Sequence, residues 1–392
     1  MRSVELFAGA GGLGIGVSRA GFEPVAVIEK DRYCCDTIRQ NKDTGNWPIS
    51  NWPLWEGDIR DFVFDEIGPS VDLISGGPPC QPFSLGGKHR GHRDSRDMFP
   101  QAVRAVRDLQ PRAFLFENVK GLTRKSFSEY FEYIQFQLKY PEISQMDDEH
   151  WSDHYSRLNQ HAETGRSKGL HYRLWVEKLN AADYGVPQRR ERVFFVGLRD
   201  DLNIEWTKPP EIYSNDALLW EQSRSGEYWD RYKVAQQDRV MSFRAWRRAR
   251  KLSAKPNTKP WNTVRDAIHD LPDPEIGGRD VKKILNHRFQ AGAKSYPGHT
   301  GSPLDEPAKT LKAGVHGVPG GENMLLRPDG SIRYFTVRES ARLQTFPDEL
   351  IFHGSWTETM RQLGNAVPVT LATVVADSIY KCLEITGEAC AA

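Results

Sequence analysis

The stretch VELFAGAGGLGIG, residues 4–16, decides the fold. Its first residues are apolar and strand-like, and Gly9, Gly11 and Gly12 separate them from a helical pattern. Glycines allow a tight turn there and let the backbone N–H groups at a helix amino terminus approach a ligand. A strand-to-helix turn that binds nothing would contain the same glycines. In both cases the stretch predicts the first strand and helix of an α/β sheet.

Similar apolar runs recur over the first 120 residues, separated by helical patterns, at residues 24–29, 71–75 and 113–117. This alternation predicts a parallel sheet built from βαβ units, whose ligands bind beyond the carboxyl ends of the strands. Sheet-like sequence resumes at residue 172 and again at residues 192–198. The polar residues 123–170 interrupt the pattern, and we expect them to form an inserted surface segment.

Two carboxylates follow the early strands. Glu29 ends the second strand, twenty positions after Gly9, and Asp58 lies in the next loop, GDIRD. A carboxylate at the end of the second strand can accept hydrogen bonds from both hydroxyls of a ribose. Phe7 either offers an aromatic face to a ligand or ends its strand as a core residue. These residues predict a nucleoside pocket but leave its ligand open.

The loop SGGPPCQPFS, residues 75–84, contains one of the five cysteines, Cys80. Its glycines and prolines indicate a rigid, exposed turn, so we expect a reactive thiol and not the inert buried cysteine that is otherwise common. Glu117 ends the next predicted strand 37 positions later, which leaves room for one crossover helix. The two side chains should therefore meet at one edge of the sheet.

The stretch GVPQRRERVFFVG, residues 185–197, has four charges directly before a strand. Side chains alternate along a strand, so Arg190 and Arg192 should point the same way. A solvated charged edge is the alternative explanation.

The second half of the chain is unevenly charged. The net charge of the whole chain is +1, yet residues 231–260 carry ten Lys or Arg against Asp238 alone. Such a basic surface indicates a polyanionic partner, although a helix with a solvated basic face would have the same composition. Trp, Arg, Pro and Gly become frequent from about residue 201, so we place a domain boundary near residue 200.

The composition argues against several classes of function. Mean hydropathy is −0.60, and we expect no apolar run long enough to cross a bilayer. The first residues show no signal-sequence pattern, so we expect an intracellular protein. The odd number of cysteines without a C-x-x-C pair favours neither disulfides nor a zinc finger. His150 and His154 have helical spacing beside acidic residues, but no HExxH motif is present and no metal is expected.

Taken in order, these motifs resemble those of the DNA (cytosine-5) methyltransferases. The matching blocks are FAGAGG, the acidic residue after the second strand, GDIRD, GPPCQPFS, ENV, PQRRER, RESARLQTFPD and QLGNAVPV. They span nearly the whole chain and are together highly specific. The resemblance implies a Rossmann-like, S-adenosylmethionine-dependent catalytic sheet over residues 1–200, interrupted at 123–170. It further implies a smaller, irregular target-recognition domain over 201–335, and a hinge with carboxyl-terminal helices over 336–392.

The resemblance also implies roles for individual residues. The catalytic group comprises Cys80 as covalent nucleophile with Glu117, Arg190 and Arg192 around the target base. The cofactor group comprises Phe7, Gly9, Gly11, Glu29, Asp58, Ile59, Pro79 and Asn365. The DNA-contacting group comprises Ser84, Arg244, Arg247, Arg248 and Thr310, of which Thr310 belongs to a threonine-leucine pair. Lys30 departs from the family, because an aromatic residue often covers the adenine at this position.

The implied reaction is methylation of carbon 5 of a flipped cytosine within a specific duplex DNA sequence, in a bacterial restriction-modification system. We expect a cytoplasmic, nucleoid-associated monomer whose companion endonuclease acts separately. Two alternatives stay open. One is RNA cytosine methylation by the same site, and the other is a catalytically silent DNA reader that binds S-adenosylmethionine.

Overall fold

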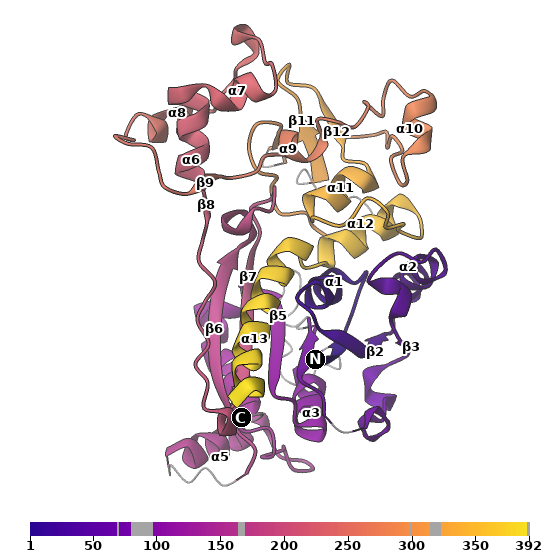
Figure 1. The fold of residues 1–392 in the computed structure, drawn as a ribbon, viewed down its shortest axis with the longest axis vertical. Coiled ribbons are helices and arrows are strands. Elements are labelled where there is room, and N and C mark those ends of the chain that lie inside the picture. The colour runs from indigo at the N-terminus through magenta and orange to yellow at the C-terminus, as the bar shows by residue number, and fades with distance from the viewer. Residues whose placement is uncertain (69, 80–96, 164–168, 298, 314–322, 390–392) are drawn as a thin grey trace.

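A mixed seven-stranded sheet forms the core of the molecule (Figure 1), with the strand order β3-β2-β1-β4-β5-β7-β6. The computed structural model describes residues 1–68, 70–79, 97–163, 169–297, 299–313 and 323–389. The strands are β1 Arg2–Leu6, β2 Glu23–Glu29, β3 Leu54–Glu56, β4 Leu73–Gly76, β5 Ala113–Val119, β6 Tyr172–Asn180 and β7 Glu191–Arg199. Strands β1 to β5 are parallel, whereas β7 is antiparallel to both β5 and β6. The predicted α/β class is confirmed, although the short strand β3 was not expected.

Helices cover both faces of this sheet. They are α1 Gly12–Arg19, α2 Arg32–Asp43, α3 Phe99–Leu109, α4 Ser128–Lys139, α5 Trp151–Glu163 and α13 Val369–Ala389. Helices α1 and α13 pack together on one face, while α3 and α4 contribute to the core on the other. A Cβ atom at Gly16 would lie 2.4 Å from the Cβ of Ala372, so the glycine allows α1 and α13 to approach closely.

The segment 123–170 differs from the expected surface insertion. Its first helix, α4, buries Tyr130, Tyr133, Ile134 and Leu138 in the main core, and α5 adds Leu158. The apolar residues recur at helical spacing, but polar neighbours made the segment look exposed in the sequence. His154 of this segment is also buried, with one ring nitrogen 2.8 Å from the Tyr133 hydroxyl and the other 2.7 Å from the Ile143 carbonyl. Both ring nitrogens of His154 therefore form hydrogen bonds that hold α5 against its neighbours.

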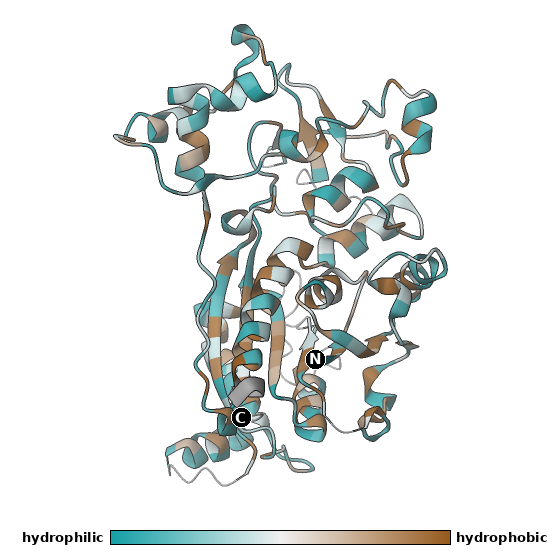
Figure 2. Ribbon diagram, viewed as in Figure 1, coloured by the Kyte–Doolittle hydropathy of each residue, from teal (hydrophilic) through white to brown (hydrophobic). Residues whose placement is uncertain are grey.

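A region of short elements lies above the sheet in Figure 1. Its helices and strands are β8 Tyr213–Ser214, α6 Asn215–Trp220, α7 Glu227–Arg231, α8 Phe243–Ala249, β9 Lys259–Pro260, α9 Val264–Ile268, α10 Arg279–Lys283, β10 Ser302–Pro303, β11 Met324–Leu326 and β12 Ile332–Tyr334. Figure 2 shows hydrophilic colours on much of α7, α8 and α10, in contrast to the hydrophobic strands of the sheet. Trp206, just beyond β7, still packs with the sheet, because its indole N–H donates to Ser378 of α13.

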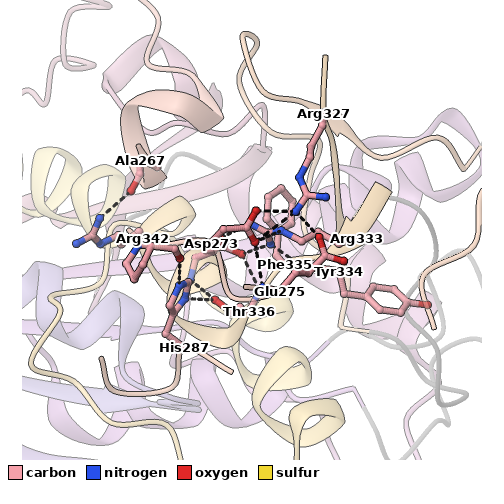
Figure 3. Close-up of polar contacts among 12 residues, drawn as sticks. Ala267, Asp273, Glu275, His287, Arg327, Arg333, Tyr334, Phe335, Thr336 and Arg342 are labelled. Atoms are coloured by element: carbon pink, nitrogen blue, oxygen red, sulfur yellow. Dashed lines mark hydrogen bonds and ion pairs between the residues drawn. The ribbon is translucent and has the colours of Figure 1, made fainter. Parts of the chain in front are cut away.

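Two helices connect this region to the sheet: α11 Val337–Leu343 and α12 Trp356–Asn365. Figure 3 shows the polar network at the start of α11. The guanidinium of Arg333 donates to both carboxylate oxygens of Glu339, at 2.6 and 2.7 Å, and both side chains are buried. Thr336 and Glu339 also form a capping box, so the ion pair and the helix start reinforce each other. Arg327, paired with Asp273 at 3.0 Å, extends the network into the upper region.

The sequence predicted no apolar run long enough to cross a bilayer, but the stretch Trp356–Ile385 meets that criterion by length and composition. Within it, α13 packs on α1 and on the sheet, and its residues Leu371, Val375 and Ile379 are fully buried. Those residues contribute to the protein core.

Candidate active site

The turn after β1 and the end of β2 meet at one carboxylate, Glu29. Its oxygens accept hydrogen bonds from the backbone N–H groups of Gly9 at 2.7 Å, Lys30 at 2.8 Å and Asp31 at 2.7 Å. Burial raises the pKa of Glu29, and the three N–H groups act in the opposite direction by stabilising the carboxylate. Phe7 enters the same turn with a φ of 55°, an uncommon conformation for a residue with a side chain. The local backbone thus fixes the position of this carboxylate.

Asp58 lies nearby, in the loop after β3. Its carboxylate accepts a bidentate pair of hydrogen bonds from Arg60, at 2.5 and 2.9 Å, which lowers the pKa of Asp58. The ammonium of Lys30 lies 3.4 Å from the same carboxylate. The residue that replaces the expected aromatic therefore takes part in a charged cluster at the rim.

A cavity of about 830 Å³ lies at the carboxyl ends of β1, β2, β4 and β5. Seven of the eight residues expected to bind the cofactor line it: Phe7, Gly9, Glu29, Asp58, Ile59, Pro79 and Asn365. Gly11 does not line it. A Cβ atom at Gly11, whose φ is +89°, would lie 2.8 Å from the ring of Trp52, so the structure explains this glycine by packing and backbone conformation. Glu117 lines the same cavity, which we call the catalytic cavity.

Glu117 and Arg192 form a buried ion pair where β5 and β7 lie side by side. The Arg192 Nε atom is 2.7 Å from the Glu117 Oε1 atom, and each side chain is at most one-tenth exposed. Burial raises the pKa of Glu117, and the charge of Arg192 opposes this rise. Despite the short distance, Oε1 of Glu117 accepts no hydrogen bond of good geometry from any described residue.

Arg190 lies close to Glu117 and Arg192, but its guanidinium is bonded to backbone carbonyls. It is fully buried, and its guanidinium donates to the backbone carbonyls of Leu311 at 2.9 Å, Gly364 at 2.7 Å and Ala366 at 2.8 Å. These bonds tie β7 to the turn that carries Asn365, a cavity residue. Because its guanidinium donates to three backbone carbonyls, Arg190 has a structural role next to the Glu117–Arg192 pair.

Cys80 and Ser84 lie outside the described residues. The described residues on either side of residues 80–96 are close together, since the Met98 N–H donates to the Pro79 carbonyl at 3.0 Å. Asn118, next to Glu117, donates to the Pro78 carbonyl at 2.9 Å. Pro78 and Pro79, directly before Cys80 in sequence, both line the catalytic cavity.

The expected DNA-contacting residues are spread over two parts of the upper region. Arg244 and Arg248 line a second cavity of about 460 Å³ together with Arg189. Arg247 is on the same helix, α8, with its guanidinium 5.9 Å from the centroid of the Phe243 ring. Thr310 donates to the Arg189 carbonyl at 2.7 Å. Arg189 therefore connects both parts to β7.

The residues of the catalytic cavity that had no predicted role include Glu5, Asn118 and Arg361. Glu5 lies in β1, is 2% exposed and accepts a hydrogen bond from Ser75. A charged residue within an apolar strand was the sequence signal for it. Asn118 belongs to the quoted ENV block but had no assigned role. Arg361 of α12 donates to Asp31 at 2.9 Å, a contact over 330 residues that no local pattern could indicate.

Comparison with known proteins identifies the family. The family model described as C-5 cytosine-specific DNA methylase matches residues 1–140 and 151–381, so α4 belongs to the common fold and the interruption is limited to ten residues between α4 and α5. The Type II methyltransferase M.PspPI of Psychrobacter sp. is 33% identical, with 97% of this chain and 79% of that protein covered. The Type II methyltransferase M.NgoMIV of Neisseria gonorrhoeae is 30% identical, with 97% and 98% covered.

Solved structures show the same fold at lower identity. A DNA modification methyltransferase encoded within an E. coli prophage has a TM-score of 0.58 and 22% identity, with 98% of this chain and 99% of that chain covered. The S. pombe Dnmt2 methyltransferase has a TM-score of 0.55 and 18% identity over the same shares.

Proposed function

Because the chain belongs to the C-5 cytosine-specific DNA methylase family, it is a DNA (cytosine-5) methyltransferase, and we propose that it uses S-adenosylmethionine to methylate a cytosine flipped out of duplex DNA. The observation that carries this proposal is the catalytic cavity itself. Glu29, suited to a nucleoside, and Glu117, suited to a base, line one continuous space. A methyl donor and a target base bound there would be held next to each other, as direct transfer requires.

The residues of the cavity fit S-adenosylmethionine. Glu29 would bind the ribose hydroxyls, since its carboxylate is held in place by three backbone N–H groups. Asp58 and Ile59 would contact the adenine, and the ring of Phe7 offers a face to a cation. When bound, S-adenosylmethionine supplies an electrophilic methyl group.

Carbon 5 of cytosine is a weak nucleophile, so the ring must first be activated. We propose that the Cys80 thiolate adds to carbon 6, forming a carbon–sulfur bond and moving electron density toward carbon 5 and N3. Glu117 would hydrogen-bond N3 and the exocyclic amine, a task for which its raised pKa favours the required protonated form. Arg192 would orient Glu117 and bind O2. After carbon 5 is methylated, a water molecule acting as base would take its proton, and elimination of the Cys80 thiolate from carbon 6 would restore the aromatic ring.

We further propose that residues 201–335, the recognition segment, bind the duplex while residues 1–200 perform the chemistry and residues 336–392 return to the catalytic part. Arg244, Arg247, Arg248 and Thr310 of this segment, together with Ser84, would contact the DNA. Flipping a base costs a few kcal/mol, which such contacts offset.

The relatives suggest the cellular setting. Since they are named Type II methyltransferases, we propose that this chain methylates host DNA in a bacterial restriction-modification system. It would act in the cytoplasm as a monomer, separately from any companion endonuclease.

Transfer of tritium from labelled S-adenosylmethionine tests the proposal directly. We expect label in duplex DNA and none in transfer RNA. Label in transfer RNA alone would establish the RNA alternative, and binding without any transfer would establish the silent reader. Bisulfite sequencing of DNA from a host that expresses the chain would then identify the modified cytosine and its sequence.

A further inference from the structure

Helix α8 exposes two aromatic side chains at the surface of the recognition segment. Phe243 is 72% exposed and Trp246 is 45% exposed, while Ala249 is the buried residue of the helix. The two rings stack on each other, with centroids 6.1 Å apart and planes inclined by 20°. Adjacent exposed apolar rings form a patch of the kind that marks an interaction site.

Cations surround these rings. The guanidinium of Arg250 lies 4.8 Å from the centroid of the Trp246 ring, and that of Arg247 lies 5.9 Å from the Phe243 ring. Residues 239–251 contain six Lys or Arg and no carboxylate. The partner of this face must therefore be negatively charged and must offer flat groups on which aromatic rings can stack. A nucleic acid has both properties, whereas a protein surface rarely does.

The helix is held firmly enough to present the rings. Ser242 caps it by accepting a hydrogen bond from the Ala245 N–H at 3.2 Å, and Arg248 pairs with Asp216 of α6 at 2.6 Å. Helix α8 lies beside the segment that leads into β7, because its residues Arg244 and Arg248 share a cavity with Arg189, two positions before Glu191 at the start of β7.

We infer that Phe243 and Trp246 stack on the bases of the bound DNA, inserting at a base step beyond the flipped cytosine, while Arg247 and Arg250 neutralise the adjacent phosphates. This inference rests on the proposed binding of duplex DNA by the recognition segment. Aromatic side chains inserted at a base step open the stack and bend the duplex. Stacking does not depend on salt, whereas phosphate contacts do.

The test measures the dissociation constant for a duplex that carries the mapped site, by fluorescence anisotropy over a series of salt concentrations. We expect Phe243→Ala and Trp246→Ala each to weaken binding about tenfold without changing the salt dependence. Trp246→Phe should bind like the wild type, because it keeps a ring. Arg247→Gln and Arg250→Gln should instead reduce the salt dependence. Trp47→Ala, at a residue 61% exposed outside the recognition segment, is the matched control.

Bending provides a second measurement. The wild type should shorten the distance between dyes at the two ends of the duplex, and the variant with both rings replaced should not. Unchanged affinity and unchanged bending in that double variant would overturn the inference. The rings would then be assigned to contact with a protein partner. Methylation by the wild type is scored separately, so loss of the proposed function would be recognised independently of the ring variants.

Discussion

The catalytic cavity and the recognition segment depend on different physical properties. Glu117 lines the cavity and pairs with Arg192, and both are buried, as is the neighbouring Arg190; their charges interact with specific atoms a few ångströms away. In the recognition segment, the cations of the short helix α8 are exposed to solvent. Single changes in the cavity should therefore have large effects that salt does not alter, whereas changes to the exposed cations of the recognition segment should have small effects that depend on salt.

The largest effect is expected from Cys80→Ala. Without a thiolate to add at carbon 6 the ring cannot be activated, so methyl transfer should fall to background, a loss of at least about 1000-fold. The dissociation constant for duplex DNA should change little. Measurable turnover by this variant would refute covalent catalysis. A duplex with 5-fluorocytosine should trap only the wild type in an adduct that resists denaturation.

Next in size is Glu117→Gln. The amide cannot provide the protonated carboxyl that the proposed adduct requires, and we expect turnover to fall roughly 100- to 1000-fold at constant DNA affinity. The effect should be the same at low and high salt. Glu177→Gln, the same change in β6 away from the cavity, should leave turnover unchanged. If both variants lost activity equally, the assignment of Glu117 would be wrong.

Arg190→Met tests whether Arg190 stabilises the fold through its hydrogen bonds to backbone carbonyls. Three backbone carbonyls would lose their donors, and at about 1 kcal/mol per hydrogen bond the free energy of unfolding should fall by about 3 kcal/mol. Urea denaturation measures this loss. Arg189→Met, at the neighbouring residue with a partly exposed side chain, should cost little. Because the Arg190 bonds hold the turn around Asn365, we also expect weaker binding of S-adenosylmethionine by Arg190→Met. Equal stability of the two variants would contradict this role.

Glu5 predicts a pH dependence of stability. Burial raises its pKa to about 8, opposed by the hydrogen bond from Ser75, so the folded protein keeps a proton that the unfolded chain releases above its ordinary pKa of 4.5. The free energy of unfolding should therefore decrease as the pH rises from about 5 to 8, by up to about 1.4 kcal/mol per pH unit from this group. Glu5→Gln should remove that contribution, as measured by urea denaturation at several pH values. An unchanged slope would show that Glu5 does not hold the proton.

The sequence allowed the sheet, the glycine turn and the Glu29 and Glu117 positions to be predicted, because each depends on strand periodicity and on residues at strand ends. Two features depended on tertiary contacts instead. Alternation in β7 aligned Arg190 with Arg192, yet the acceptors of Arg190 come from residues 311–366, which no local pattern brings near. Helix α4 looked exposed because its aromatic residues are separated by polar ones, while only the folded sheet offers the surface that buries them.

The smallest effects should distinguish two neighbouring arginines of α8. Among the described residues, Arg244 has no carboxylate partner, whereas Arg248 pairs with Asp216. Arg244→Gln should remove one phosphate contact, weaken DNA binding several-fold and lower the salt slope by about 0.9. Arg248→Gln should change the slope less, because its charge is already partly neutralised. Asp216→Asn should strengthen binding by releasing Arg248 for a phosphate. If Asp216→Asn weakened binding instead, the ion pair would be needed to hold α8 in place, and the recognition segment would share the structural sensitivity of the cavity.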